Sequence, residues 1–300
     1  MTGRSRTIGL LVPTIRDPYW AEVAAGIEPA AAEAGFAVLI ASGYGDPVRA
    51  ERTLEVLLGN RVDGIAVTTS AGVAEPRLAQ TMELPTVVIG LDPPLGTLEL
   101  EGARSAPIST LLDAARRHRL DASVSQVGFD DLDAGELAAR HLIELGHRRI
   151  AFIAGPATLA SVLRIGGVRA VLEQAGLSLR AVFGGGDTVE HGRAAGLELL
   201  RGDRDFTAII AFNDLLATGL VRAARTLGID VPAQLSVISF DDVALASLVE
   251  PALTTIRAPK HEMGARAIEL LLEQMNSEAD IKWELLKGAL VVRDSTAPPS

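Results

Sequence analysis

Short, wholly apolar runs alternate along the chain with longer segments whose apolar residues recur at helical spacing. Runs without polar alternation predict strands buried on both faces, as in parallel sheets covered by helices. In the first half we predict such strands at residues 7–12, 36–41, 64–67, 85–89 and 124–129. Amphipathic spacing predicts helices over residues 19–34 and 47–58, each in a connection between strands. This β-then-α order indicates a doubly wound α/β sheet.

The same alternation starts again near the middle of the chain. Apolar residues 138, 139, 142, 143 and 145 share one helical face, and Gly146 can end that helix in a left-handed conformation. An apolar strand, residues 150–154, follows after one short turn. We interpret this as the passage from one α/β lobe to a second, with a ligand cleft between them.

The second half continues the pattern to the end of the chain. Its further strands are predicted at residues 179–183, 208–211, 237–240, 253–256 and 285–292. Its helices are predicted at residues 161–175, 191–200, 215–227 and 261–275. Residues 92–122 interrupt the rhythm, and Ser109 has the position of an N-cap for a helix that runs to about Arg119.

Composition narrows the class of protein. A chain of 300 residues favours two lobes over one core. No apolar run approaches the roughly 20 residues that a membrane helix needs, and no secretory apolar region is found near the start. The chain has no cysteine, which excludes disulfides and thiol catalysis and is typical of a cytoplasmic protein. A net charge of −10 argues against broad contact with nucleic acid.

Candidate binding residues follow the predicted strands. Ligands of open parallel sheets bind beyond the carboxyl ends of the strands. Aromatic rings combined with carboxylate, amide and guanidinium groups suit a small polyhydroxylated molecule, because the rings cover its C–H face and the polar groups bind its hydroxyls. The side chains at these strand ends are Asp17, Tyr19, Trp20, Ser161, Arg164, Asn213 and Asp241.

Each of these residues also has a purely structural interpretation. Asn213 and Asp241 could cap helices. Tyr19 and Trp20 could be packing residues, and Arg164 could pair with a surface carboxylate. An enzyme is not favoured, because no nucleophile elbow, phosphate loop, dinucleotide fingerprint or metal-ligand spacing is present. A hydrolase with Asp241 as its base would lack a nucleophile, so we expect no catalysis, no cofactor and no metal.

Taken together, several motifs resemble the effector-binding core of LacI/GalR-type transcriptional repressors. They extend over nearly the whole chain in the order of that family, and they lie at residues 2–10, 61–65, 141–152, 212–214, 231–232, 236–242, 251–255, 263–264 and 291–296. The resemblance implies a periplasmic-binding-protein-like fold, an α/β protein of two doubly wound parallel-sheet lobes joined by three crossovers. We place the lobes at residues 1–146 plus 257–284 and 147–256 plus 285–300.

The resemblance also implies a role for the candidate residues. By position, Tyr19 and Trp20 match ligand contacts of the first loop, Arg164 the arginine that grips effector, and Asn213 and Asp241 two further contacts. Asp131 matches an aspartate that asparagine normally follows, whereas Leu132 follows it here. The implied protein is a cytoplasmic homodimer that binds a sugar or related polyol between its lobes and thereby controls operator DNA binding.

Two features depart from the family pattern. The family places a helix-turn-helix before the Thr2-Gly3-Arg4 junction where this chain starts, so we expect DNA contact only through a domain missing from these residues. Residues 93–122 are longer than the usual connection. The alternative function is an extracytoplasmic sugar-binding protein of a transporter, which shares the fold but needs a signal peptide.

Overall fold

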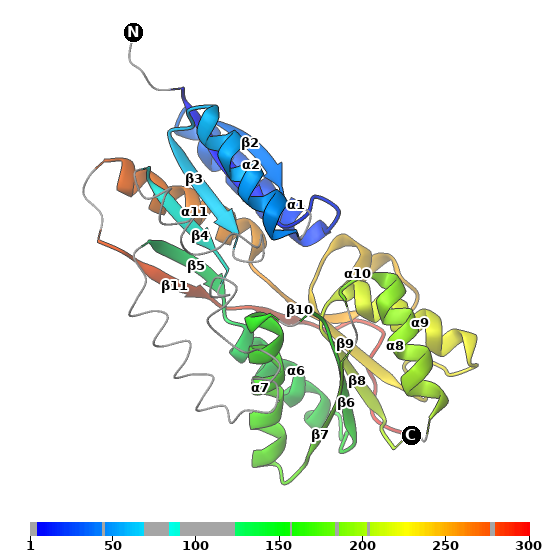
Figure 1. The fold of residues 1–300 in the computed structure, drawn as a ribbon. Helices are drawn as coiled ribbons and strands as arrows, with labels where there is room; N and C mark the ends of the chain where they lie inside the picture. The colour runs from blue at the N-terminus through cyan, green and yellow to red at the C-terminus, as the bar shows by residue number, and fades with distance from the viewer. Residues whose placement is uncertain are drawn as a thin grey trace. The chain divides into compact units, whose positions relative to one another are not determined.

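The computed structural model describes residues 5–43, 46–68, 84–90, 124–156, 158–183, 186–202, 205–276 and 280–300. These residues form two compact units, each built on its own sheet (Figure 1). The whole segment 93–122, which includes the predicted helix over residues 109–119, lies outside the described residues. Among the residues described, no helix is both long and apolar enough to cross a membrane.

Unit 1 contains a parallel sheet of six described strands in the order β11-β5-β4-β3-β1-β2. Helices α1 and α11 pack together against this sheet, and α2 packs on β1 and β2 with its own apolar cluster. The elements of unit 1 are β1 Thr7–Val12, α1 Pro18–Glu33, β2 Ala37–Ser42, α2 Pro47–Gly59, β3 Gly64–Thr68, β4 Thr86–Ile89, β5 Ser125–Phe129, α11 Lys260–Met275 and β11 Trp283–Leu286.

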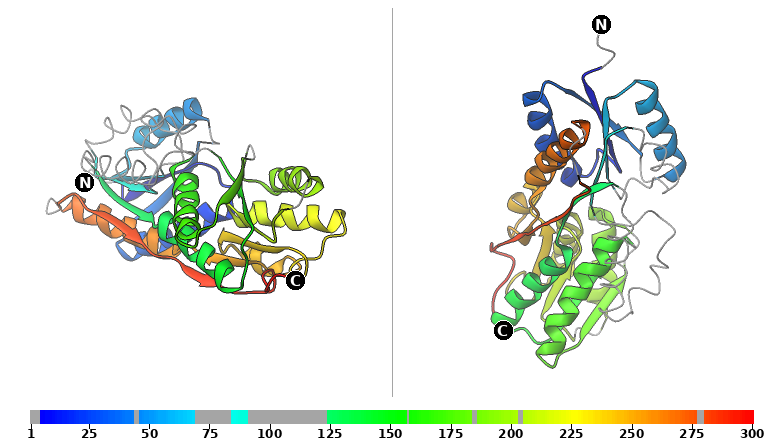
Figure 2. Two further views of the ribbon diagram at one scale, coloured as in Figure 1. Left: turned by 90° about the horizontal axis from the view of Figure 1, so that it is seen from below. Right: turned by 90° about the vertical axis from the view of Figure 1, so that its left-hand side faces the viewer.

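Unit 2 contains a second sheet of six described strands in the order β12-β10-β9-β8-β6-β7, parallel except for β12, which runs antiparallel to β10. The elements of unit 2 are α6 Asp131–Glu144, β6 Ile150–Ala154, α7 Leu159–Gln174, β7 Leu179–Phe183, α8 Val189–Arg201, β8 Ala208–Ala211, α9 Asp214–Thr226, β9 Ser236–Asp241, α10 Ala244–Leu248, β10 Thr254–Arg257 and β12 Ala289–Val291. Helices α8 and α9 lie side by side, as do α6 and α7 (Figures 1 and 2).

The fold class predicted from the sequence is confirmed: the chain forms two parallel-sheet α/β lobes. Within the described residues the chain passes between the units at Phe129–Asp130, Ala258–Pro259 and Leu286–Lys287. By its contacts α6 belongs to unit 2, whereas the sequence-based boundary assigned residues 131–146 to the first lobe. The difference arises because α6 packs on α7.

The predicted continuous strand over residues 285–292 is wrong. Its first part is β11, which pairs with β5 in unit 1, and its second part is β12, which pairs with β10 in unit 2. Hydrophobic pattern alone does not reveal this division, because both halves are apolar and only Lys287-Gly288 separates them. The short helix α10 was not predicted either.

Local capping chemistry explains where the helices begin and end. Asp17 caps α1, with its carboxylate accepting a hydrogen bond from the backbone of Tyr19, and Pro18 occupies the first helical position. At the other end of a helix, Gly146 has a φ of 99° and ends α6 as predicted. The chain can then enter β6 directly.

The contact between α6 and α7 depends on two glycines. A Cβ at Gly135 would lie 2.2 Å from the backbone oxygen of Arg164, and a Cβ at Gly167 would lie 2.1 Å from that of Leu132. Only glycine allows the two backbones to approach this closely. The contact therefore fixes the segment of α7 that carries Arg164 against the start of α6.

We expect Gly135→Ala to lower the free energy of unfolding by about 1–3 kcal/mol, because the added methyl group must push the two helices apart. Gly59→Ala is the matched control, since no atom lies within 4 Å of a Cβ at that position. Urea denaturation of the two variants measures the difference. Equal stabilities would contradict the proposed role of close helix packing.

Candidate functional site

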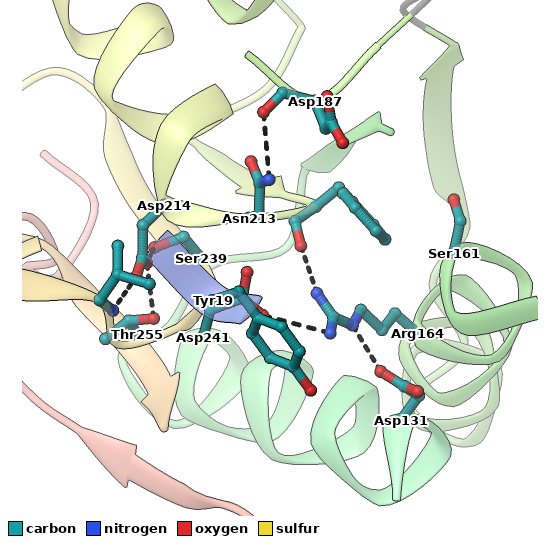
Figure 3. Close-up of polar contacts among 12 residues, drawn as sticks. Tyr19, Asp131, Ser161, Arg164, Asp187, Asn213, Asp214, Ser239, Asp241 and Thr255 are labelled. Carbon is teal, nitrogen blue, oxygen red and sulfur yellow. Dashed lines mark hydrogen bonds and ion pairs between the residues drawn. The ribbon is translucent and has the colours of Figure 1, made fainter. Parts of the chain in front are cut away.

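Arg164 is held in unit 2 by contacts from three separate elements. Its Nε donates to Asp131 Oδ1 at 2.7 Å, at the start of α6, and its Nη2 donates to Asp241 Oδ1 at 3.3 Å, at the end of β9. Its Nη1 donates to the backbone oxygen of Phe212 at 2.6 Å, after β8 (Figure 3). The Arg164 side chain is only 5% exposed, so its charge is buried together with its partners.

Two phenylalanine rings complete this environment. The guanidinium carbon lies 4.8 Å from the ring centroid of Phe212 and 4.7 Å from that of Phe240. Cation–π attraction strengthens when the cation is desolvated, so both rings stabilise the buried charge. We call Asp131, Arg164, Phe212, Phe240 and Asp241 the Arg164 cluster.

The backbone at the end of β9 adopts an unusual conformation. Asp241 has a φ of 101° and Asp242 a φ of 53°, values that non-glycine residues rarely adopt. Asp242 accepts hydrogen bonds at 2.6 Å from Arg257 Nε and from Arg293 Nη2. Burial opposes ionisation of Asp242, but these two arginines lower the pKa of its carboxyl below the ordinary value. The ion pairs thus fix the turn that directs Asp241 towards Arg164.

Asp214 carries a third carboxyl group at this edge of the sheet. It is buried and accepts hydrogen bonds from Ser239 Oγ at 2.5 Å, Thr255 Oγ1 at 2.8 Å and the backbone of Val243 at 2.8 Å (Figure 3). Desolvation and, second, the nearby charge of Asp241 raise the pKa of Asp214 to about 7, although the three hydrogen bonds favour its ionised form.

Asn213 has both a capping role and a second contact. Its Oδ1 accepts from the backbone of Leu216 and caps α9, as the structural interpretation predicted. Its Nδ2 donates to the backbone oxygen of Asp187 at 3.1 Å. The capping interpretation is wrong for Asp241. Its carboxylate binds Arg164, and the next helix, α10, begins after Val243 without a side-chain cap.

Ser161 lies one helical turn before Arg164 on α7. The residue is fully buried, yet its hydroxyl oxygen makes no hydrogen bond within the described residues. A buried polar group without a partner normally costs stability, and such groups are found where a ligand or water supplies the missing bond. Ser161 is therefore the candidate residue with the most direct indication of a ligand contact.

The three remaining candidates lie in unit 1, where each has a structural contact. Asp17 caps α1, and the Tyr19 hydroxyl lies 3.8 Å from Met263 Sδ, to which it donates. The rings of Tyr19 and Trp20 meet edge to face, with centroids 4.9 Å apart. These contacts agree with the packing interpretation of both residues, and their role in ligand binding stays a prediction.

Unit 2 therefore brings together five of the candidates, namely Asp131, Ser161, Arg164, Asn213 and Asp241, at the carboxyl end of its sheet. The carboxylates of Asp131 and Asp241, with which Arg164 pairs, are both buried. Leu132 in place of asparagine does not prevent Asp131 from joining the cluster. Sequence analysis did not identify Phe212, Phe240 or Asp187, although each phenylalanine directly precedes a candidate polar residue at a strand end.

The side chains gathered at this edge of the sheet in unit 2 are suited to binding a small polar ligand. They present hydrogen-bond acceptors, one buried cation and aromatic surface. Among the described residues, no cluster of three or more His, Cys, Asp or Glu side chains could hold a metal ion.

Comparison with known proteins identifies the family. Residues 139–296, more than half of the chain, match the periplasmic binding protein-like domain. The transcriptional regulator DegA of Bacillus subtilis, described as of the helix-turn-helix type, is 34% identical over 99% of this chain and 83% of its own length. This chain belongs to the LacI family of transcriptional regulators. It covers the effector-binding core of that family.

Two solved structures that are similar to this LacI-family chain contain a bound ligand. A LacI-family regulator from Enterococcus faecium with bound ribose has a TM-score of 0.81 and 26% identity, covering 98% of this chain and 100% of that one. A periplasmic binding protein/LacI regulator from Alkaliphilus metalliredigens, in complex with D-xylulofuranose, has a TM-score of 0.80 and 26% identity, covering 97% and 99%. The structural relatives of this regulator core thus include sugar-bound proteins.

We predict that Arg164→Met destabilises the protein by about 3–5 kcal/mol, because it leaves the buried carboxylates Asp131 and Asp241 without their cation. Arg149→Met is the control: Arg149 pairs with Asp205 at 3.2 Å, but both side chains are more than half exposed. That exposed pair should contribute less than about 1 kcal/mol. Chemical denaturation distinguishes the two. Neutralising both carboxylates in the Arg164→Met background should recover part of the loss, and no recovery would contradict this explanation.

The raised pKa of Asp214 predicts a pH-dependent stability difference between the protein and its Asp214→Asn variant. Between pH 4 and about 7, unfolding releases the proton that the folded carboxyl retains, so the contribution of Asp214 to stability is lost as pH rises through this window. The unfolding free energy of the unmodified protein should therefore fall relative to that of Asp214→Asn. Burial lowers the pKa of His141 and His147 in both proteins, so their effect cancels in the difference. A difference that does not change with pH would contradict the assignment.

Proposed function

We propose that this chain is the ligand-sensing and dimerisation core of a LacI-type regulator and that its effector is a small sugar or related polyol. The observation that supports this function is the Arg164 cluster together with the unpartnered hydroxyl of Ser161. Hydroxyl groups can donate to the carboxylates and exchange hydrogen bonds with Ser161, while a phenylalanine ring can cover C–H surface. The ribose and D-xylulofuranose bound by structural relatives belong to the same chemical class.

In this proposal unit 1 supplies the remaining contacts. Asp17, Tyr19 and Trp20 would engage the effector when it binds in the cleft between the lobes. Because such a ligand has contacts with both lobes, it favours the closed arrangement over the open one. A coupling free energy of about 1–3 kcal/mol would change operator affinity roughly 5–150-fold. In this proposal the operator is bound in the cytoplasm through a helix-turn-helix domain, the type for which the relative DegA is named.

The relatives favour a regulator over the alternative, an extracytoplasmic sugar-binding protein of a transporter. DegA is named as a transcriptional regulator, and so is the ribose-bound structure from E. faecium. The same relatives argue against an enzyme. Asp241, the base that a hydrolase would need, is bonded to Arg164.

We predict that Ser161→Ala weakens effector binding without destabilising the protein. The Ser161 hydroxyl makes no hydrogen bond within the described residues, so its removal takes no hydrogen bond from the free protein. The complex with the effector would lose one hydrogen bond worth about 0.5–1.5 kcal/mol, which corresponds to a roughly 2–12-fold loss of affinity. Thermal-shift screening of sugars and polyols finds the ligand, and calorimetry measures its affinity. Ser247→Ala, an exposed serine on α10, is the control. Unchanged affinity in Ser161→Ala would remove Ser161 from the site.

The proposed homodimer has a candidate surface on unit 1. The edge strand β2 exposes Leu39 and Ile40, and α2, which packs against it, exposes Val48 and Val56. An exposed apolar edge of this kind invites pairing or aggregation unless it is covered. A second copy of the chain would cover it.

We expect Ile40→Asp and Val56→Asp to convert the dimer into monomers, as measured by sedimentation equilibrium, because each places a charge in the apolar contact. Ile281→Asp is the control, since Ile281 is similarly exposed but lies outside β2 and α2. If both Ile40→Asp and Val56→Asp still form dimers, the dimer interface lies on another surface.

A further inference from the structure

The charge balance of the Arg164 cluster indicates which chemical class of effector the site can accept. Arg164 is one cation between two carboxylates, Asp131 and Asp241, and it is bonded to both. Asp214 lies close enough for the charge of Asp241 to raise its pKa. The group therefore carries a net negative charge, even though it contains an arginine.

The charge of Arg164 is also committed to the protein. Its donors reach Asp131, Asp241 and the backbone oxygen of Phe212, and its guanidinium carbon lies over the rings of Phe212 and Phe240. An anion approaching this guanidinium would have to compete with two aspartates. Arg164 consequently acts as the group that positions the carboxylates.

A further carboxylate lies at the same end of the sheet. The backbone oxygen of Asp187 accepts from Asn213, while its carboxylate makes no hydrogen bond or ion pair within the described residues (Figure 3). Arg257 and Arg293, the two arginines bonded at the neighbouring turn, are engaged by Asp242. Within the described part of unit 2, acceptors with negative charge thus outnumber cations around this site.

We propose that the part of the effector bound by unit 2 is uncharged and rich in hydroxyl groups, and that Asp131, Asp187 and Asp241 exclude phosphate and carboxylate groups from it. This inference rests on the proposed function and narrows its ligand class to neutral sugars and polyols. Hydroxyl protons bind the carboxylates, and an anion in the same place meets like charges in a partly desolvated setting, where repulsion is strong.

The test is to measure by calorimetry how tightly the intact protein binds each member of a matched set of ligands. The neutral sugar or polyol that gives the largest thermal shift is measured beside its phosphate ester and beside the acid made by oxidising one of its carbons. The neutral compound should bind at least about tenfold more tightly than either anion, since one unfavourable charge contact readily costs that factor.

The outcomes separate the two proposals. If the phosphate ester or the acid binds as tightly as its neutral parent, or more tightly, the inference about charge is overturned and effector sensing stands. If no member of any matched set binds, the proposed function is overturned, and the inference falls with it.

A variant tests the physical cause of the preference. Asp187→Asn keeps the shape of the side chain and removes its charge. The affinity for the neutral ligand divided by the affinity for its anionic derivative should therefore fall about threefold or more. Asp205→Asn is the control, because Asp205 is exposed and pairs with Arg149, and its ratio should not change. An unchanged ratio in Asp187→Asn would overturn the role given to this carboxylate.

Discussion

The buried ion pairs of Arg164 are the interaction on which the candidate site depends. A guanidinium removed from water is tolerated only when its hydrogen-bond donors are satisfied and its charge is balanced. Asp131, Asp241 and the backbone of Phe212 supply that balance, and they come from α6, from the end of β9 and from the loop after β8. One side chain on α7 therefore connects segments that are far apart in the sequence and fixes the edge of the sheet at which a ligand would bind.

Three aspartates close to this edge have different electrostatic environments. Asp241 and Asp131 both pair with Arg164. The carboxylate of Asp242 stays ionised, because Arg257 and Arg293 balance its negative charge. Asp214 is bonded only to uncharged donors in the described structure, and its pKa is correspondingly raised. The positive φ values of Asp241 and Asp242 allow adjacent carboxylates to serve these separate partners. Strained backbone is commonly retained where a site requires it.

Much of the fold could be predicted from the sequence because buried parallel strands are continuous apolar runs. The runs at Thr7–Val12 and Ile150–Ala154 coincide with β1 and β6. Prediction failed between β11 and β12, because the sequence is apolar on both sides of Lys287-Gly288 although the two strands pair in different sheets. The site was predicted in part: strand ends identified Arg164 and Asp241. That the arginine lies over both phenylalanine rings depends on how β8 and β9 align, which the sequence alone does not specify.

The central claim is that the Arg164 cluster and Ser161 form an effector site. The most direct measurement is a crystal structure of the protein with its tightest-binding neutral sugar. The account predicts sugar hydroxyls within hydrogen-bond distance of Ser161 Oγ and of the carboxylate of Asp131 or Asp241. A sugar bound elsewhere on the protein, with the Ser161 hydroxyl still unpartnered, would contradict it.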